Sequence, residues 1–200
     1  MRYAAENPDV AAVFGQDAAA LYAHYVNNGI REGRKGYSTN DLANAYLRVY
    51  EVSSQIINDS MSDEEKIKAV HDWMCLNIAY DHDNYVNDTI PDESYSLYGA
   101  MEKGMAVCSG YAETFKTFMD VQGIECESID GTAKGGHHGW NRVKVNGEDY
   151  YIDVTWDDPV PDVPGRVRYD YYLTKDPTFG GDHSAFTDPL DYYRYIGWDI

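Results

Sequence analysis

The chain has 200 residues, of which 44% are hydrophobic and 25% are charged, a balance typical of one globular domain or of one domain with a small appendage. Its 34 acidic residues outnumber its 16 basic residues, and the net charge of −18 argues against nucleic acid or anionic membrane as a partner while weakly favouring Lys-rich partners. No apolar run approaches the roughly 20 residues that cross a bilayer, so membrane insertion is not expected.

The first 36 residues are interpreted as a small module of two short helices. Asn7-Pro8 is typical of an N-cap followed by proline in the first helical turn, and Asp17 is placed to cap a second helix over 18–28. A linker rich in glycine and charge follows, so we expect a module over 1–36 and a larger domain over 37–200. The polar start shows no signal peptide, and we interpret the chain as starting inside a longer sequence whose leader is absent.

The larger domain is predicted to place helices before strands. Ser62 to Glu65 forms a capping box, and Asn146-Gly147 supplies the positive φ angles of a type I′ hairpin turn. In chain order, the expected elements are a helix over 41–57, a helix after the capping box, a helix over 108–122, a strand over 125–130 and hairpin strands over 140–145 and 148–156. Helices followed by an antiparallel meander indicate an α+β fold with helices packed on an antiparallel sheet.

The three cysteines, an odd and small number, argue against a disulfide scaffold. Cys75 and Cys126 are interpreted as core residues. Cys108 follows a glycine-containing approach and begins a predicted helix, where unpaired N–H groups and the helix dipole lower the pKa of a thiol. A nucleophilic thiolate needs a partner imidazole, and the imidazole needs an orienting carboxylate.

The register of the predicted hairpin places both groups together. With a two-residue turn, Val145 faces Glu148. Counting back along both strands puts His138 and Asp153 on one polar face as diagonal neighbours, roughly 7–8 Å apart at the backbone. His137 falls on the opposite face, so the arithmetic selects His138. A three-residue bulged turn would break this parity.

Three sequence motifs, in their order along the chain, resemble those of a known protein family. They are Val107-Cys108-Ser109-Gly110-Tyr111-Ala112, His138-Gly139-Trp140-Asn141-Arg142-Val143 and Tyr151-Ile152-Asp153-Val154-Thr155-Trp156-Asp157-Asp158-Pro159, followed by Tyr169-Asp170-Tyr171-Tyr172-Leu173. The first three look like the core motifs of transglutaminase-like proteins, and the fourth resembles a trailing segment. The resemblance implies a papain-like core with Cys108 as nucleophile, His138 as general base and acid, and Asp153 orienting the imidazole. Gly139 stands where alanine is usual, with little effect expected because both residues are small.

Further candidate residues surround this triad. An oxyanion hole needs two donors, and the backbone N–H of Cys108 is the natural first. The second donor is left open between the side chains of Tyr98 and Tyr80. Trp140 is interpreted as structural, or as one wall of a substrate groove.

Three other features are interpreted without a role in the chemistry. The stretch 81–88 faintly resembles a calcium loop, but it lacks glycine at the sixth position, so neither a metal nor a cofactor is expected. His71 is interpreted as a surface or cap residue of its helix. His183 has no visible partner.

The N-terminal module carries a separate resemblance over about 30 residues. Its residues are Tyr3, Asn7-Pro8-Asp9, Phe14-Gly15, His24-Tyr25, Gly29 and Glu32-Gly33-Arg34. They look like the short modules of secreted bacterial surface proteins. The resemblance implies an extracellular or cell-surface location and no particular chemistry.

These observations predict thiol-dependent acyl chemistry on an amide or peptide bond through Cys108, His138 and Asp153. We favour hydrolysis, as in a cysteine peptidase or amidase, because no dedicated calcium site or amine-acceptor feature is visible. Two alternatives stay open: cross-linking of protein glutamine by amine transfer, and a catalytically inactive surface module that binds a peptide or glycan. The expected partner is a peptide or protein substrate, with Lys-rich chains weakly favoured; the sequence identifies neither the natural substrate nor the oligomeric state.

Overall fold

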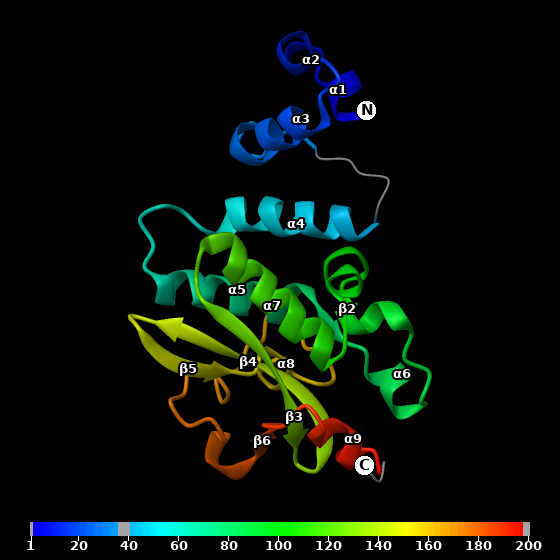
Figure 1. Ribbon diagram of the computed structural model, residues 1–200, viewed down its shortest axis with the longest axis vertical. Helices are drawn as coiled ribbons and strands as arrows, with labels where there is room; N and C mark the ends of the chain where they lie inside the picture. The colour runs from blue at the N-terminus through cyan, green and yellow to red at the C-terminus, as the bar shows by residue number, and fades with distance from the viewer. Residues whose placement is uncertain (1, 36–40, 198–200) are drawn as a thin grey trace.

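The computed structural model describes residues 2–35 and 41–197. Along its long axis the molecule consists of a small helical module, a layer of longer helices, an antiparallel sheet and a C-terminal segment (Figure 1). The first and last described residues lie at opposite ends of this axis (Figure 1). Among the described helices, none combines the length and the apolar composition that crossing a bilayer requires.

Four short helical elements form the N-terminal module: α1 (Arg2–Glu6), α2 (Pro8–Phe14), α3 (Ala18–His24) and the π-helix η1 (Tyr25–Gly29). As predicted, Asp17 caps α3, since its Oδ1 accepts from the backbone N–H groups of Ala19 and Ala20 at 3.0 and 3.1 Å. Asn7 does not cap α2 with its side chain. Helix α1, which was not predicted, precedes it, and Asn7 Nδ2 donates instead to the carbonyl oxygen of Tyr3 at 2.8 Å.

The module has a small hydrophobic core of its own. Its buried members are Tyr3, Ala4, Val10, Leu21 and Tyr25, joined by Leu47 from the next helix. Arg34 ties the end of the module to its start by donating to Asn7 at 2.7 Å and to Asp9 at 3.0 Å. The expected boundary at residue 36 lies outside the described residues, and the division of the chain there stays a prediction.

Three longer helices form the layer above the sheet: α4 (Asp41–Ile56), α5 (Asp63–Asn77) and α7 (Cys108–Gln122) (Figure 1). The predicted capping box is present at the start of α5. Ser62 Oγ accepts from the backbone N–H of Glu65 at 3.3 Å, and Glu65 Oε2 accepts from the backbone N–H of Ser62 at 2.8 Å. Helix α7 ends at Gly123, whose φ of 70° is readily adopted by glycine.

The segment between α5 and α7 contains several short elements that the sequence did not predict. They are β1 (Ala79–Tyr80), α6 (His82–Val86), the 3-10 helix η2 (Asp92–Tyr95), the π-helix η3 (Gly99–Lys103) and β2 (Met105–Ala106). Strands β1 and β2 pair in parallel, with Tyr80 beside Ala106. This pairing brings Tyr80 next to the segment that leads into Cys108.

A four-stranded antiparallel sheet follows, in the order β5-β4-β3-β6. Its strands are β3 (Cys126–Ala133), β4 (Gly136–Val145), β5 (Glu148–Ile152) and β6 (His183–Ala185). The hairpin register is the predicted one, from Val145 opposite Glu148 to Asn141 opposite Ile152. Strand β4 starts four residues earlier than predicted, because it pairs with β3 down to Gly136 opposite Ala133.

The predicted strand over 148–156 is too long. The chain leaves the sheet at Asp153 and forms the short helix α8 (Val154–Asp157). Asp153 is the N-cap of α8, and its Oδ1 accepts from the backbone N–H of Trp156 at 3.2 Å. The capping bond ends the ladder after Ile152, so the strand pairs expected beyond that point are not formed.

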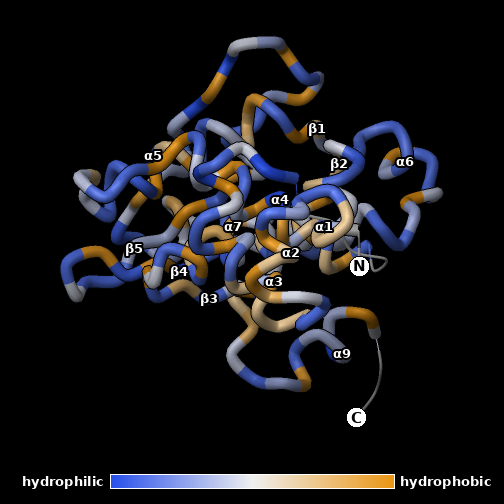
Figure 2. The backbone as a smooth tube through the Cα atoms, turned by 90° about the horizontal axis from the view of Figure 1, so that it is seen from above, coloured by the Kyte–Doolittle hydropathy of each residue, from blue (hydrophilic) through white to orange (hydrophobic). Residues whose placement is uncertain are grey.

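The core lies between the helices and one face of the sheet. Buried sheet residues such as Val143 and Ile152 pack with Phe115 and Phe118 of α7. The C-terminal segment contains the 3-10 helix η4 (Phe179–Gly181), the edge strand β6 and α9 (Asp191–Tyr195), and it lies at the end of the molecule away from the N-terminal module (Figure 1). Seen from above, the loops around α6 and at β5 project from the body and are largely hydrophilic (Figure 2).

Candidate active site

Cys108 is the first residue of α7, and it is almost completely buried, with 9% of its surface exposed. The backbone just before Cys108 is held in place, because the N–H of Val107 donates to the carbonyl oxygen of Ser94 at 2.8 Å. A Cβ atom on Gly110 would lie 2.7 Å from that same oxygen, so only glycine lets the first turn of α7 approach so closely. The first-turn N–H groups of a helix have no intrahelical partner, so those at the start of α7 remain available near Cys108.

His138 and Asp153 form the second half of the predicted constellation. His138 lies on β4, and its Nε2 is 2.7 Å from Oδ2 of Asp153. Both residues are buried, with 6% and 1% of their surfaces exposed. Because Oδ1 of Asp153 is held by the N-cap bond to Trp156, Oδ2 is directed at the imidazole. The helix cap therefore orients the carboxylate, and the carboxylate orients the ring.

The thiol and the imidazole shift each other toward their charged forms. Burial raises the pKa of Cys108, but the hydrogen bond and charge of His138 and the backbone N–H of Gly139 outweigh burial and lower it. Burial also lowers the pKa of His138, yet the charge and hydrogen bond of Asp153, together with Cys108, raise it to about 10. Since Nε2 of His138 is bonded to Asp153, Nδ1 is the ring nitrogen available to the thiol. The arrangement therefore favours a thiolate beside an imidazolium.

A cavity of about 860 Å³ lies over Cys108 and His138. Its wall is rich in aromatic and acidic side chains and includes Tyr80, Tyr85, Asp88, Tyr95, Asp130, Trp156, Tyr192 and Tyr195. Among the described residues, no lysine or arginine lines this cavity. The reactive sulfur thus faces a space large enough for a peptide segment, with a wall suited to cationic or aromatic groups.

Of the three groove candidates, Tyr80, Tyr98 and Trp140, only Tyr80 lines the cavity over Cys108. Tyr80 lines the cavity, and burial followed by the nearby charge of Cys108 raises the pKa of its phenol. Tyr98 does not line it: it precedes η3, packs against the core, and Lys103 Nζ lies 5.3 Å from its ring centroid. The structure thus does not bring Tyr98 to the cavity over Cys108, because its side chain packs against the core.

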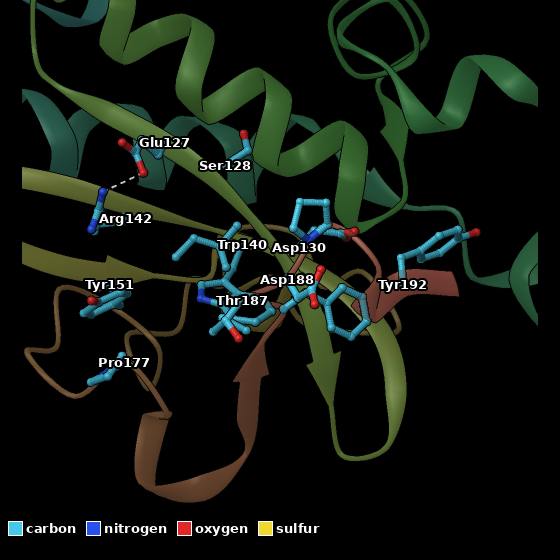
Figure 3. Close-up of a pocket in the computed structure, with 14 residues that line it drawn as sticks. Glu127, Ser128, Asp130, Trp140, Arg142, Tyr151, Pro177, Thr187, Asp188 and Tyr192 are labelled. Carbon is cyan, nitrogen blue, oxygen red and sulfur yellow. Dashed lines mark hydrogen bonds and ion pairs between the residues drawn. The ribbon is translucent and has the colours of Figure 1, made fainter. Parts of the chain in front are cut away.

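Trp140 lines a different cavity. This second space of about 560 Å³ lies on the outer face of the sheet, where Trp140 is drawn with Asp130, Thr187, Asp188 and Tyr192 (Figure 3). Only 1% of the Trp140 surface is exposed, and its ring stacks on that of His138 with a centroid distance of 6.1 Å. The structure thus places Trp140 behind the imidazole, and not in the wall of the cavity over Cys108.

Sequence reasoning missed His183. Its Nε2 lies 3.0 Å from Oδ2 of Asp153, the oxygen that also bonds His138, and its side chain is completely buried. The pairing of β6 with β3, with His183 opposite Ala133, brings it there from 30 residues along the chain. No local pattern signals such a contact, because a three-residue edge strand has too few residues to show a period.

His138, Asp153 and His183 are also the described residues that could hold a metal ion, since their ligand atoms lie within 4.8 Å of one another. The nitrogen–oxygen distances of 2.7 and 3.0 Å are those of hydrogen bonds. The stretch 81–88 resembles a calcium loop only faintly. In the structure, the carboxylate of Asp81 accepts hydrogen bonds from Asn84 and Ser94, at 2.9 and 2.7 Å, and Asp81 stands at the start of α6.

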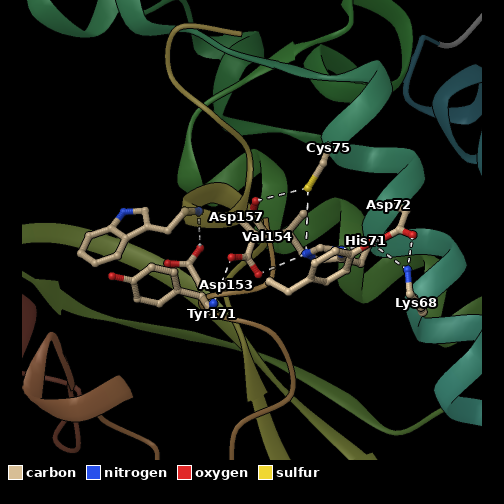
Figure 4. A network of polar contacts seen from close by, with 10 residues as sticks. Lys68, His71, Asp72, Cys75, Asp153, Val154, Asp157 and Tyr171 are labelled. Atoms are coloured by element: carbon tan, nitrogen blue, oxygen red, sulfur yellow. Dashed lines mark hydrogen bonds and ion pairs between the residues drawn. The ribbon is translucent and has the colours of Figure 1, made fainter. Parts of the chain in front are cut away.

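A second Cys-His-Asp cluster, formed by Cys75, His71 and Asp157, lies near Asp153 (Figure 4). His71 is completely buried, which corrects the expectation of a surface or cap residue. Its Nε2 lies 3.2 Å from Oδ2 of Asp157 and 4.0 Å from Sγ of Cys75, and its Nδ1 lies 3.0 Å from Oδ1 of Asp72. Asp157 Oδ1 accepts from the backbone N–H of Tyr171 at 2.9 Å. This network joins α5, α8 and the C-terminal segment.

The chain belongs to the transglutaminase-like superfamily, which it matches over residues 50–155. It is 26% identical over 150 residues to kyphoscoliosis peptidase of Mus musculus and 24% identical over 150 residues to that of Homo sapiens. Both alignments cover 66% of this chain and 22% of the relative, so the chain spans about a fifth of the length of these relatives.

A crystal structure described as a TGase shares the fold. The two chains superpose with a TM-score of 0.51 at 19% sequence identity, over 67% of this chain and 37% of the other. Helices packed on a curled antiparallel sheet of four strands are thus the common architecture, in agreement with the α+β fold that the sequence predicts.

Proposed function

We propose that the protein hydrolyses an amide or peptide bond by thiol chemistry. The observation that carries the proposal is the arrangement of one sulfur, one ring and one carboxylate. Cys108 begins a helix and shares a hydrogen bond with His138, whose other ring nitrogen lies 2.7 Å from Asp153. The two relatives named as peptidases support hydrolysis over amine transfer.

The geometry supports a two-step reaction. The thiolate of Cys108 attacks the carbonyl carbon, and a carbon–sulfur bond forms as the carbonyl oxygen becomes an oxyanion. The carbon–nitrogen bond then breaks, and Nδ1 of His138 gives its proton to the leaving amine, which leaves a thioester. A water molecule next attacks the thioester and gives a proton to His138. The carbon–sulfur bond breaks, and the acid product and the thiolate–imidazolium pair result.

Two groups are placed to stabilise the oxyanion. The backbone N–H of Cys108 is in the first turn of α7, where it has no intrahelical partner. The phenol of Tyr80 lines the same cavity, on the strand that pairs with the approach to Cys108. We propose these two donors because the phenol lies close enough to the sulfur for its charge to raise the pKa of Tyr80.

The cavity wall favours a substrate that carries positive charge. Asp88 and Asp130 contribute carboxylates to it, and five tyrosines offer aromatic faces on which an ammonium or guanidinium can lie. Asp130 is already paired with His137, whose Nε2 lies 2.8 Å from it. We therefore propose a Lys- or Arg-bearing peptide as substrate, with Asp88 as the freer carboxylate.

The location of the protein is a separate proposal. The resemblance of the N-terminal module to those of secreted bacterial surface proteins supports an extracellular or cell-surface setting, and the acidic composition is compatible with it. Fractionation of the source cells, with detection of the protein in medium, envelope and cytoplasm, tests this. A protein confined to the cytoplasm contradicts it.

One experiment separates hydrolysis from its alternatives. A library of Lys- and Arg-containing peptides is incubated with the protein and a labelled primary amine, and cleavage, ammonia release and amine incorporation are measured together. Hydrolysis predicts cleavage or ammonia release that Cys108→Ala abolishes and that Cys126→Ala, a buried cysteine outside the cavity, retains. Incorporation in excess of hydrolysis indicates a transglutaminase. Binding without turnover, equal in the wild type and Cys108→Ala, indicates a binding module.

A further inference from the structure

We propose that His183 is a positioning residue that shares the carboxylate of Asp153 with His138 and limits how strongly that carboxylate holds the proton of His138. The inference rests on the proposed thiol chemistry and adds a fourth residue to it. Its basis is one oxygen atom with two imidazole partners, since Oδ2 of Asp153 lies 2.7 Å from Nε2 of His138 and 3.0 Å from Nε2 of His183.

The carboxylate of Asp153 is fully engaged. Its Oδ1 accepts from the backbone N–H of Trp156, and its Oδ2 accepts from the two rings. Burial alone raises the pKa of such a group, yet the interactions of Asp153 with His138, and then those with His183, together lower it. His183 therefore helps to keep a buried carboxylate ionised, which is the form that orients His138.

The surroundings of His183 fix how its ring bonds. Nε2 must carry a hydrogen to bond a carboxylate, while Nδ1 is buried and has no hydrogen-bond partner among the described residues. Aromatic rings enclose it, with centroids at 4.4 Å for Phe179, 4.7 Å for Trp156 and 4.9 Å for Trp140. The hydrogen bond to Asp153 is thus the one polar contact of the His183 ring among the described residues.

The second hydrogen bond to Oδ2, from His183, weakens the interaction of Asp153 with His138. An oxygen that accepts two hydrogen bonds accepts each of them less strongly. Because Oδ2 also accepts from His183, Asp153 stabilises the imidazolium of His138 less than a carboxylate with a single partner would. This matters because His138 must give up its proton to the leaving amine in each cycle. The aromatic enclosure holds the His183 ring in the orientation that this bond needs.

The test replaces His183 with phenylalanine, which keeps a planar ring in the aromatic enclosure but removes the donor. The pH dependence of iodoacetamide labelling of Cys108 is measured by mass spectrometry, with EDTA present. Without the donor, Asp153 stabilises the imidazolium more strongly, so the thiolate forms at lower pH. The labelling midpoint is expected to fall by about one pH unit, on the scale of one hydrogen bond to a charged group. On a peptide substrate, kcat is expected to fall about tenfold with KM unchanged, because proton donation slows.

Two further variants separate this role from packing. His183→Gln keeps an N–H donor and is expected to retain the wild-type midpoint. If His183→Phe does not fold, His183→Leu, which also lacks the donor, takes its place in the labelling assay. Phe179→Leu trims the enclosure without touching the hydrogen bond and is expected to lower stability while leaving the midpoint in place. A midpoint that is unchanged or higher in His183→Phe, or that moves equally in Phe179→Leu, overturns the proposal. If no peptide is turned over, the proposed function fails, yet the labelling midpoint still decides the role of His183.

Discussion

Two Cys-His-Asp clusters lie at the two ends of the short helix α8, and the difference between them shows what makes a thiol a nucleophile. At its start, Asp153 serves His138 and Cys108. At its end, Asp157 bonds His71, which in turn lies 4.0 Å from Cys75 (Figure 4). The residue types are the same, but the surroundings of the two sulfurs are opposite.

The position of each sulfur accounts for the contrast. Cys108 begins a helix, faces a cavity and gains the charge of His138, so its pKa is lowered. Cys75 lies inside α5, where burial and then the charges of three carboxylates raise its pKa far above the usual value. Both ring nitrogens of His71 face carboxylates. We propose chemistry for the first cluster, whereas the second joins α5 to α8 and to the C-terminal segment.

The largest effect is expected when the cysteine of each cluster is replaced in turn. Cys108→Ala removes the nucleophile, and loss of a catalytic nucleophile in a triad typically lowers turnover by roughly 10⁴-fold or more. Cys75→Ala is expected to keep turnover within about threefold and to cost about 1–3 kcal/mol of stability as a small buried cavity. Peptide turnover and thermal unfolding of both variants check this. Equal losses of activity in the two variants contradict the assignment.

The two aspartates provide the next contrast. Asp153→Asn preserves shape but cannot accept two N–H groups on an ionised oxygen, and such a change in a triad lowers turnover about 10⁴-fold. Asp157→Asn disturbs the bonds to His71 and Tyr171 and is expected to cost about 1–3 kcal/mol in unfolding free energy while reducing turnover less than about tenfold. Steady-state kinetics and urea unfolding measure both. A reversed order of the two activity losses would show that the second cluster is the catalytic one.

A smaller effect is expected at the cavity wall. Tyr80→Phe removes the candidate side-chain donor of the oxyanion hole, and loss of one such donor typically lowers kcat about 10²-fold. Tyr98→Phe is the matched control, because Tyr98 does not line the cavity and its loss should leave kcat unchanged. Kinetics on one peptide with both variants suffice. If Tyr80→Phe leaves kcat unchanged, Tyr80 is not the second donor of the oxyanion hole.

The smallest expected effect concerns Asp158, which follows α8. Burial raises its pKa to about 7, against the hydrogen bond from Tyr111. Between about pH 4 and 7 the folded state then binds more protons than the unfolded state, so this group makes stability fall as pH rises through that window. Asp158→Asn cannot ionise, so its Tm relative to wild type should be higher at pH 8 than at pH 5, by about 2–4 °C if the effect is about 1 kcal/mol. Thermal unfolding at the two pH values checks this, and a relative Tm that does not rise refutes it.

Much of the catalytic core could be predicted because its signals are local. The Asn146-Gly147 turn sets the register of β4 and β5, which the sequence predicts correctly as far as Asn141 opposite Ile152. Extending that register predicts that His138 and Asp153 are neighbours; they are, although Asp153 lies just beyond the end of β5. The start of α7 at Cys108 follows from its approach sequence and its periodicity. The strand alternation did not reveal that Asp153 leaves the sheet, because an aspartate in an apparent strand can also cap a helix.

The contacts that were missed join segments far apart in the chain. His183 reaches Asp153 through the pairing of β6 with β3, and His71 reaches Asp157 from 86 residues away. The sequence left the second oxyanion donor open between Tyr98 and Tyr80, and in the structure Tyr80 lines the cavity whereas Tyr98 packs against the core. Periodicity within one element cannot show which distant element packs against it.

The most direct test of the account is the pH dependence of iodoacetamide labelling at each cysteine, in the wild type and in His138→Gln. In the wild type, Cys108 should react well below the pH of about 8.5 at which an ordinary thiol ionises, whereas Cys75 and Cys126, whose thiol pKa values are raised, should stay unlabelled. In His138→Gln, the labelling midpoint of Cys108 should move up to that of an ordinary or buried thiol. The proposed chemistry depends on a thiolate of Cys108 that His138 stabilises. It would be contradicted if Cys108 of the wild type were labelled with the pH midpoint of an ordinary thiol and His138→Gln left that midpoint unchanged.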